Sequence, residues 1–343
     1  MRRASVATAA SLAIGVAIAA TSAVVLSSGG PDAGGRLSRN ESVSASPVKG
    51  SSHTWSPSAP SSTPARTFAA PPAPTPALPP PPARTSTPAS GGWTLTWQDE
   101  FNDPAGTRPS SSRWVFNLGG EPQWGNQEWQ YYTDRPQNVS SDGNGNLAIT
   151  ARREKLAGMQ NCPYGTCDLT SGRITTKGTF NQAYGRFEAR IKIPGGHGLW
   201  PAFWMMGNNI DSVGWPRNGE IDIMEVIGRE PGTLHGTLHG PGYSGGAGLG
   251  GFTTLPAGER FADAFHIFAI EWSGDRVVWT VDGRQYFSYA RTQLPAGKVW
   301  VFDHPFFMLL NLAVGGGWPG PPDASTVFPA TMLVDYVRAY RAT

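Results

Sequence analysis

The sequence has little of several things that would point to common protein classes. Only two of its 343 residues are cysteine, which argues against a zinc site built from several thiolates. Charged residues make up 15% of the chain, the net charge is +2 and no basic stripe is present, so a nucleic-acid partner is not expected. Outside an N-terminal apolar run the sequence also lacks a helical hydrophobic period, which argues against a helical bundle.

The two cysteines lie close together in the chain. Cys162 and Cys167 enclose a short Pro-Tyr-Gly-Thr loop. In an exported protein such a pair predicts a disulfide rather than free thiols. Because the enclosed loop is small, this bond would pin the chain locally and add little to global stability.

The N-terminal part of the chain does not have the composition of a folded domain. Residues 1–28 contain an Arg pair and an apolar run over 4–26, and are predicted to be a signal peptide or a membrane anchor. Small residues near the end of this run favour cleavage and secretion; the alternative is a cell-surface protein tethered to the membrane through residues 4–26. Residues 29–92, rich in Pro, Ser, Thr and Ala, are predicted to be a disordered linker.

Residues 93–343 have the size and pattern of one large all-β domain. Over 184–193 the apolar residues alternate with charged ones, which predicts a strand with Arg186, Glu188, Arg190 and Lys192 toward solvent. The segments 276–282 and 285–289 flank an Asp282-Gly283 turn, the signature of a hairpin. Two antiparallel sheets packed as a jelly roll are the predicted architecture.

One segment of this domain is unusually acidic for its surroundings. Glu220, Asp222 and Glu225 stand among Ile, Met and Val, although carboxylates are costly to remove from water unless they are paired or functional. Glu220 and Asp222 share one face of a strand, whereas plain alternation would turn Glu225 to the other face. A β-bulge over Ile223 and Met224 would return Glu225 to the acidic face.

Paired carboxylates are the catalytic groups of glycoside hydrolysis, in which their separation decides between retention and inversion of configuration. Flat aromatic rings near these acids are candidate sugar platforms, and Trp200, Trp204 and Trp215 are the nearest. Each of them could also be a core residue, because tryptophan carries a large apolar surface in any β domain. Trp318 is a candidate for the rim of the cleft, with loop anchoring as the alternative.

Several motifs in this order resemble glycoside hydrolase family sixteen, specifically its bacterial laminarinase (endo-β-1,3-glucanase) branch. They extend over nearly all of residues 93–340, and the extra Met224 matches the bulged catalytic strand of that branch. The segments that carry the resemblance are Trp215-Pro-Arg-Asn-Gly before Glu220–Glu225, Trp124–Glu128 with Tyr131-Tyr132, Ser171–Ile174, Gly198–Trp204, Leu238–Tyr243, Asn311–Gly317 and Asp335–Tyr340.

The resemblance implies a concanavalin A-like jelly roll with a concave substrate cleft. It also implies roles for particular residues: Glu220 as nucleophile, Glu225 as general acid/base, and Asp222 between them. Asn126, Arg173 and His239 match positions that contact sugar, while His235 is expected to be structural. By resemblance alone, Glu100 and Asp335 are candidates for a structural calcium ion, and catalysis requires no cofactor.

The function expected from the sequence is therefore a secreted, monomeric, retaining endo-hydrolase of β-1,3-glucan. Two alternatives stay open at this point. One is a non-catalytic β-glucan-binding protein of the same fold, although such proteins typically lack the catalytic acids. The other is a hydrolase of mixed-linkage β-1,3-1,4-glucan or of a galactan.

Overall fold

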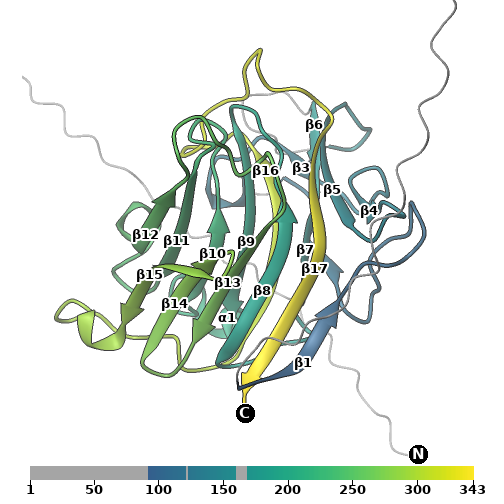
Figure 1. The fold of residues 1–343 in the computed structure, drawn as a ribbon. Coiled ribbons are helices and arrows are strands. Elements are labelled where there is room, and N and C mark those ends of the chain that lie inside the picture. The colour runs from purple at the N-terminus through teal and green to yellow at the C-terminus, as the bar shows by residue number, and fades with distance from the viewer. Residues whose placement is uncertain (1–91, 121–122, 160–167) are drawn as a thin grey trace, which may run out of the picture. The chain divides into compact units, whose positions relative to one another are not determined.

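Two β-sheets form the part of the chain that the computed structural model describes, residues 92–120, 123–159 and 168–343 (Figure 1). The predicted signal peptide or anchor and, apart from Gly92, the predicted linker lie outside these residues. So do Cys162 and Cys167, and the disulfide between them stays a prediction. No helix among the described residues is long and apolar enough to cross a membrane.

The larger sheet has ten strands, and its neighbours are antiparallel except for the parallel pair β3 and β6. Its order is β15 (Arg284–Ala290), β14 (Arg276–Val281), β13 (His266–Trp272), β8 (Gly185–Lys192), β17 (Ala330–Ala342), β5 (Leu147–Arg153), β6 (Leu169–Ser171) and β3 (Tyr131–Tyr132), with β1 (Trp93–Asp99) beside β17 and β4 (Val139–Ser141) beside β5.

The smaller sheet has seven antiparallel strands and carries the acidic segment. Its order is β12 (Leu249–Thr254), β11 (Thr233–His239), β10 (Glu220–Glu225), β9 (Leu199–Gly207), β16 (Phe306–Val314), β7 (Arg173–Thr175) and β2 (Val115–Phe116). The described residues contain one four-residue α-helix, α1 (Ile210–Val213), and three 3-10 turns, η1 (Gln123–Gly125), η3 (Gly245–Ala247) and η4 (Arg291–Gln293).

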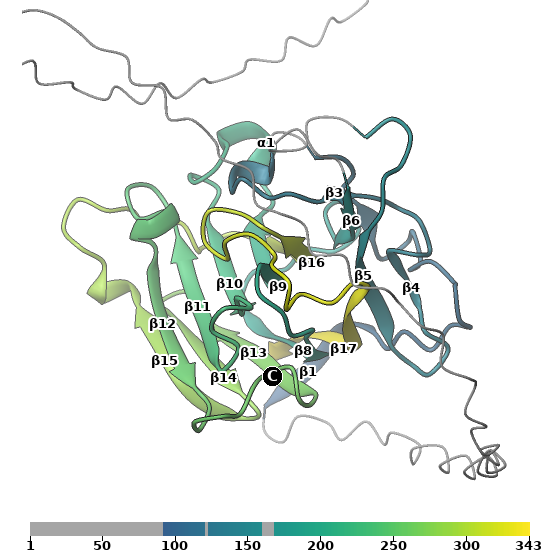
Figure 2. The ribbon, with the colours of Figure 1, turned by 90° about the horizontal axis from the view of Figure 1, so that it is seen from above.

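The hydrophobic core lies between the two sheets, which appear as two curved layers when viewed from above (Figure 2). The central strand β16 shows how one sequence serves both faces of the smaller sheet. Met308, Leu310 and Leu312 belong to the core, while Asn311 and its alternate neighbours point to the other face, as strand geometry requires. The predicted jelly roll of two antiparallel sheets is confirmed.

Two local predictions can be compared directly with the strands. The predicted hairpin is present as β14 and β15, joined by Asp282 and Gly283, both with positive φ. In β8 the apolar residues are buried as predicted, but Glu188 is only 6% exposed rather than facing solvent. It is buried because Arg186 forms a 2.7 Å ion pair with it and the Tyr340 hydroxyl donates to it at 3.1 Å.

Candidate active site

The acidic strand β10 contains the bulge that the sequence predicts. Asp222 pairs with Trp204 on β9 while Met224 pairs with Phe203, so β10 has one residue more than its neighbour over this stretch. Ile223 and Met224 are both buried in the core. The extra residue therefore returns Glu225 to the face of Glu220 and Asp222, and the three acids form a row on the face opposite the core.

Two tryptophan side chains orient the outer acids of this row. The Trp215 indole Nε1–H donates to Glu220 Oε2 at 2.5 Å, and the Trp200 indole Nε1–H donates to Glu225 Oε1 at 3.0 Å. Because an indole N–H can only donate, each bond holds one oxygen of its carboxyl group in place. Glu220 also shares a hydrogen bond with the Asp222 side chain.

His239 on β11 is the basic partner of the row. Its Nε2 lies 3.0 Å from Asp222 Oδ2. Three side-chain atoms lie within 4.8 Å of one another, one carboxylate oxygen each from Glu220 and Asp222 and one ring nitrogen from His239. The predicted cleft histidine thus contacts the middle acid rather than standing apart from the row.

Burial raises the pKa of all three carboxyl groups, because it disfavours their charged forms. The pKa of Glu220 rises to about 8 and that of Asp222 to about 7, first through burial. The pKa of Glu225 is held well above its ordinary value by burial and then by the charge of Asp222. The row can therefore retain protons at neutral pH, as a general acid must.

A cleft of about 660 Å³ lies over this row. Of the predicted site residues, Asn126, Trp200, Trp215 and His239 line it together with Glu220 and Glu225. The rim position expected for Trp318 agrees with its place in the lining. The sequence prediction missed three further lining side chains, His235, Thr237 and Phe252; His235 lies in the cleft rather than being only structural.

Arg173 and Trp204 are not among the lining residues of this cleft. The Arg173 guanidinium carbon lies 4.8 Å from the centre of the Trp204 ring and 4.5 Å from that of Trp124. The Trp204 indole N–H donates to Asn311 Oδ1 at 2.7 Å. Trp204 stands opposite Asp222 on the neighbouring strand, so this stacked group flanks the acids on the β9 side.

A buried carboxylate that sequence reasoning did not single out supports the cleft residue Asn126. Glu128 is 3% exposed and accepts hydrogen bonds from Asn126 Nδ2 at 3.1 Å, Gln130 Nε2 at 2.6 Å and the Tyr132 hydroxyl at 3.0 Å. Burial raises the pKa of Glu128, and the charge of Arg173 opposes that rise. The motif Trp124–Glu128 contained this residue, but only its partners reveal its role.

The two residues proposed for calcium each face an arginine. Glu100 accepts two hydrogen bonds from the Arg338 guanidinium, at 2.7 and 2.9 Å. Asp335 Oδ2 lies 2.5 Å from Arg190 Nη1. The calcium site stays a prediction.

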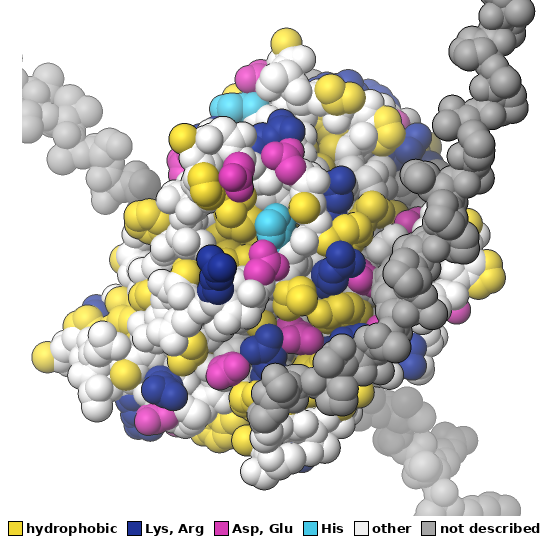
Figure 3. Space-filling view, in the orientation of Figure 1, with side chains coloured by type: hydrophobic (Ala, Val, Ile, Leu, Met, Phe, Trp, Pro, Cys, Tyr) yellow, Lys and Arg dark blue, Asp and Glu magenta, His cyan; other side chains and the backbone are white. Residues whose placement is uncertain are grey.

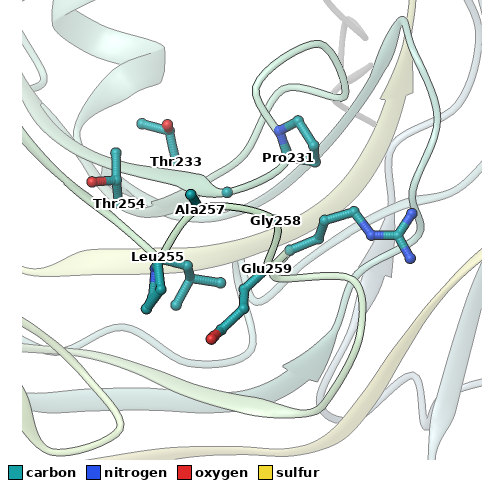
Figure 4. Close-up of a pocket in the computed structure, with 10 residues that line it drawn as sticks. Pro231, Thr233, Thr254, Leu255, Ala257, Gly258 and Glu259 are labelled. Carbon is teal, nitrogen blue, oxygen red and sulfur yellow. The ribbon is translucent and has the colours of Figure 1, made fainter.

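A second hollow, of about 460 Å³, lies where the β11 and β12 pair ends (Figure 4). Thr233 and Thr254 stand at its side, and the loop from Pro256 to Arg260 closes it. The hollow contains no aromatic lining residue and none of the three acids of β10.

The curved sheet and its row of acids define the class of this protein. Two carboxylates held by indole donors, with a third carboxylate between them and a histidine beside that third group, are equipped to cleave a glycosidic bond by acid/base chemistry. The molecule is a jelly-roll glycoside hydrolase.

The comparisons with known proteins identify the family. The family described as Glycosyl hydrolases family 16 matches residues 126–338, more than half of the chain. The protein belongs to this family. A beta-glucanase of Rhodothermus marinus is 40% identical over 73% of this chain and 85% of its own length.

Two solved structures show the same fold. The laminarinase catalytic domain of Thermotoga maritima MSB8 is 48% identical, with a TM-score of 0.68 over 74% of this chain and 100% of its own. The endo-beta-1,3-glucanase of Pyrococcus furiosus is also 48% identical, with a TM-score of 0.69 over 74% of this chain and 97% of its own.

Proposed function

We propose that the protein is an exported, retaining endo-hydrolase of β-1,3-glucan. The observation that carries this proposal is the row of Glu220, Asp222 and Glu225 on a bulged strand at the cleft. The two solved relatives, a laminarinase and an endo-β-1,3-glucanase, support the substrate. The N-terminal apolar run supports export.

The geometry suits a double displacement. In the first step Glu225 donates its proton to the glycosidic oxygen, while the Glu220 carboxylate attacks the anomeric carbon and forms a glycosyl-enzyme ester. In the second step Glu225, now a carboxylate, takes a proton from water, and the water oxygen displaces Glu220. Two inversions leave the product with the β configuration of the substrate.

The neighbouring side chains orient the two glutamates, adjust their ionisation and bind sugar. Trp215 and Trp200 hold the two glutamates in orientation through their indole N–H groups. Asp222 lies between the glutamates, so its charge opposes the ionisation of both and helps Glu225 to keep its proton. Asn126, braced by Glu128, presents an amide to the cleft for a sugar hydroxyl.

The proposal is tested by incubating the purified chain with laminarin, curdlan, barley mixed-linkage glucan, cellulose and agarose. Reducing ends and product lengths are followed over time. Rapid release of short oligomers from laminarin and curdlan is expected. Release from agarose alone would overturn the substrate, and tight laminarin binding without release would place the protein among glucan-binding proteins.

Retention is tested separately by proton NMR of the first product formed from laminarin. The β anomer is expected to appear first and the α anomer only later, by mutarotation. Initial appearance of the α anomer would exclude Glu220 as a nucleophile. Export is tested by comparing activity in the culture medium with activity in the cells.

A further inference from the structure

A band of aromatic rings leads from the acid/base residue toward the far strand of the smaller sheet. Trp200, which donates to Glu225, lies 5.4 Å from Trp318 between ring centres. Trp318 lies 5.1 Å from His235, and His235 lies 6.1 Å from Phe252. All four side chains line the same cleft, so the band is a continuous surface across it.

The strand register gives the distance between Phe252 and Glu225. Glu225 pairs with His235 on β11, and His235 pairs with Phe252 on β12. Paired residues share a face, and neighbouring strands are about 4.8 Å apart, so Phe252 stands about 10 Å from Glu225 across the sheet. A sugar at the scissile bond does not reach it, whereas the next units of a chain do.

The surface beside Phe252 is bare. Gly250 precedes it on the cleft face of β12 and pairs with Thr237. A Cβ atom at Gly250 would lie 3.0 Å from Thr237 Oγ1. The absence of a side chain there leaves a trough next to the Phe252 ring, which is 65% exposed.

Single exposed apolar residues are common on proteins and need no function. Phe252 differs because it ends an aromatic band, lies in the cleft and borders a glycine trough. A flat apolar ring with no side chain next to it can pack against the C–H face of a pyranose, while the hydroxyl groups of the sugar stay in water.

We propose that Phe252, with His235 at its edge and Gly250 beside it, is a platform for a glucose unit of the glucan on the β12 side of the cleft, beyond the unit at the catalytic acids. The inference rests on the proposed function and extends it. It assigns the β12 side of the cleft a role in binding long chains rather than in the bond-breaking step.

The test is a length series of β-1,3-linked gluco-oligosaccharides, from the trimer to the octamer, with laminarin as the longest substrate. Phe252→Ala is expected to raise KM at least fivefold for the longest substrates, with little change in kcat and little effect on the shortest. Phe252→Trp keeps a ring and should restore a KM near that of the wild type. Leu95→Ala, which removes an exposed apolar side chain from the other sheet, is the matched control and should change nothing.

A second variant tests the trough independently of the ring. Gly250→Ala places a single methyl group beside Phe252, 3.0 Å from Thr237 Oγ1 and 3.1 Å from the Gly236 carbonyl oxygen, so that Thr237 must shift slightly. It should also raise KM for long substrates selectively. Equal KM values for wild type and Phe252→Ala at every length would overturn the platform, as would a loss that is uniform across the series. If the wild-type protein cleaves none of these oligosaccharides, the proposed function itself fails, which is a different result.

Discussion

In the larger sheet, buried carboxylates lie against arginines, whereas the carboxylates of β10 do not. Glu188 pairs with Arg186 and Asp335 with Arg190. Basic and acidic side chains are correspondingly interspersed on the face shown in Figure 3. Among the described residues, the acids of β10 form no ion pair with lysine or arginine, and their one basic partner is His239.

The difference separates carboxylates that maintain the fold from carboxylates that are available for chemistry. A guanidinium beside a buried acid compensates the charge of the carboxylate and donates hydrogen bonds to it, which serves the fold. The acids of β10 have indole and imidazole partners, which orient them without fixing their charge. The cost is raised pKa values and a less stable site, as is common where function needs strain.

The largest expected effect comes from removing the attacking carboxylate. Glu220→Gln should lower kcat on laminarin by at least about a thousandfold, equivalent to about 4 kcal/mol of barrier. The fold should persist, because Glu220 is not part of a charged pair with arginine or lysine. Activity near that of the wild type would remove Glu220 from the mechanism. Asp211→Asn, at an exposed acid of α1, is the control.

The next effect concerns the buried acids of the larger sheet that form ion pairs with arginine. Arg186→Met leaves Glu188 buried without its cation, and the free energy of unfolding should fall by about 3 kcal/mol. Activity per folded molecule should not change. Denaturant unfolding measures the free energy of unfolding, and active-site titration measures the activity per folded molecule. Arg108→Met breaks an exposed pair with Asp134 and should cost less than about 1 kcal/mol. Equal losses in the two variants would contradict the comparison between the sheets.

A third effect depends on pH. Because the pKa of Glu220 rises from 4.5 to about 8 on folding, the folded protein holds a proton that the unfolded chain has lost between these values. The free energy of unfolding therefore falls as pH rises through this window. Glu220→Gln removes that loss and should be more stable than the wild type above pH 8, by about 1 kcal/mol or more, the value of one pKa unit.

The same measurement near pH 4 should show little difference between the two proteins, because Glu220 is then protonated in both the folded and unfolded states. A stability difference that is constant from pH 4 to pH 9 would show that burial does not raise this pKa.

The smallest effect comes from the hydrogen bond to Glu225. Trp200→Phe keeps a ring against Trp318 but removes the indole donor, and a single hydrogen bond is worth about 1 kcal/mol. We expect kcat to fall by less than about tenfold. Because this bond lowers the pKa of Glu225, its loss should move the alkaline limb of the kcat/KM profile to higher pH. Trp272→Phe, which removes a core indole donor, should leave that limb unmoved.

The sequence was sufficient to predict the bulged acidic strand because the acids themselves carry the information. Plain strand alternation would turn Glu225 away from the face of Glu220 and Asp222. A bulge is needed to return it, and β10 contains one. The hairpin at Asp282 and Gly283 was equally local. In both cases a few neighbouring residues determine the conformation, so no knowledge of the rest of the chain is needed.

Other parts of the site depend on contacts between distant segments. Glu188 sits in a strand of alternating charges, and only Arg186 and Tyr340 make it a buried residue. The sequence made no prediction for Phe252, because nothing in a glycine-rich segment shows which face of its strand meets solvent. Its place on the cleft face follows from its pairing with His235 on the neighbouring strand β11, a contact that short-range patterns do not contain.

The pairing of β1 with β17 has a consequence for engineering. Trp93 stands beside Ala342, and the Thr343 N–H donates to the Gly92 carbonyl at 2.7 Å. The first and last described residues thus meet at one place in the larger sheet, away from the strand that carries the acids. A short peptide could join them and new ends could be opened at the Asp282-Gly283 turn, giving a circular permutant whose cleft is left uncut.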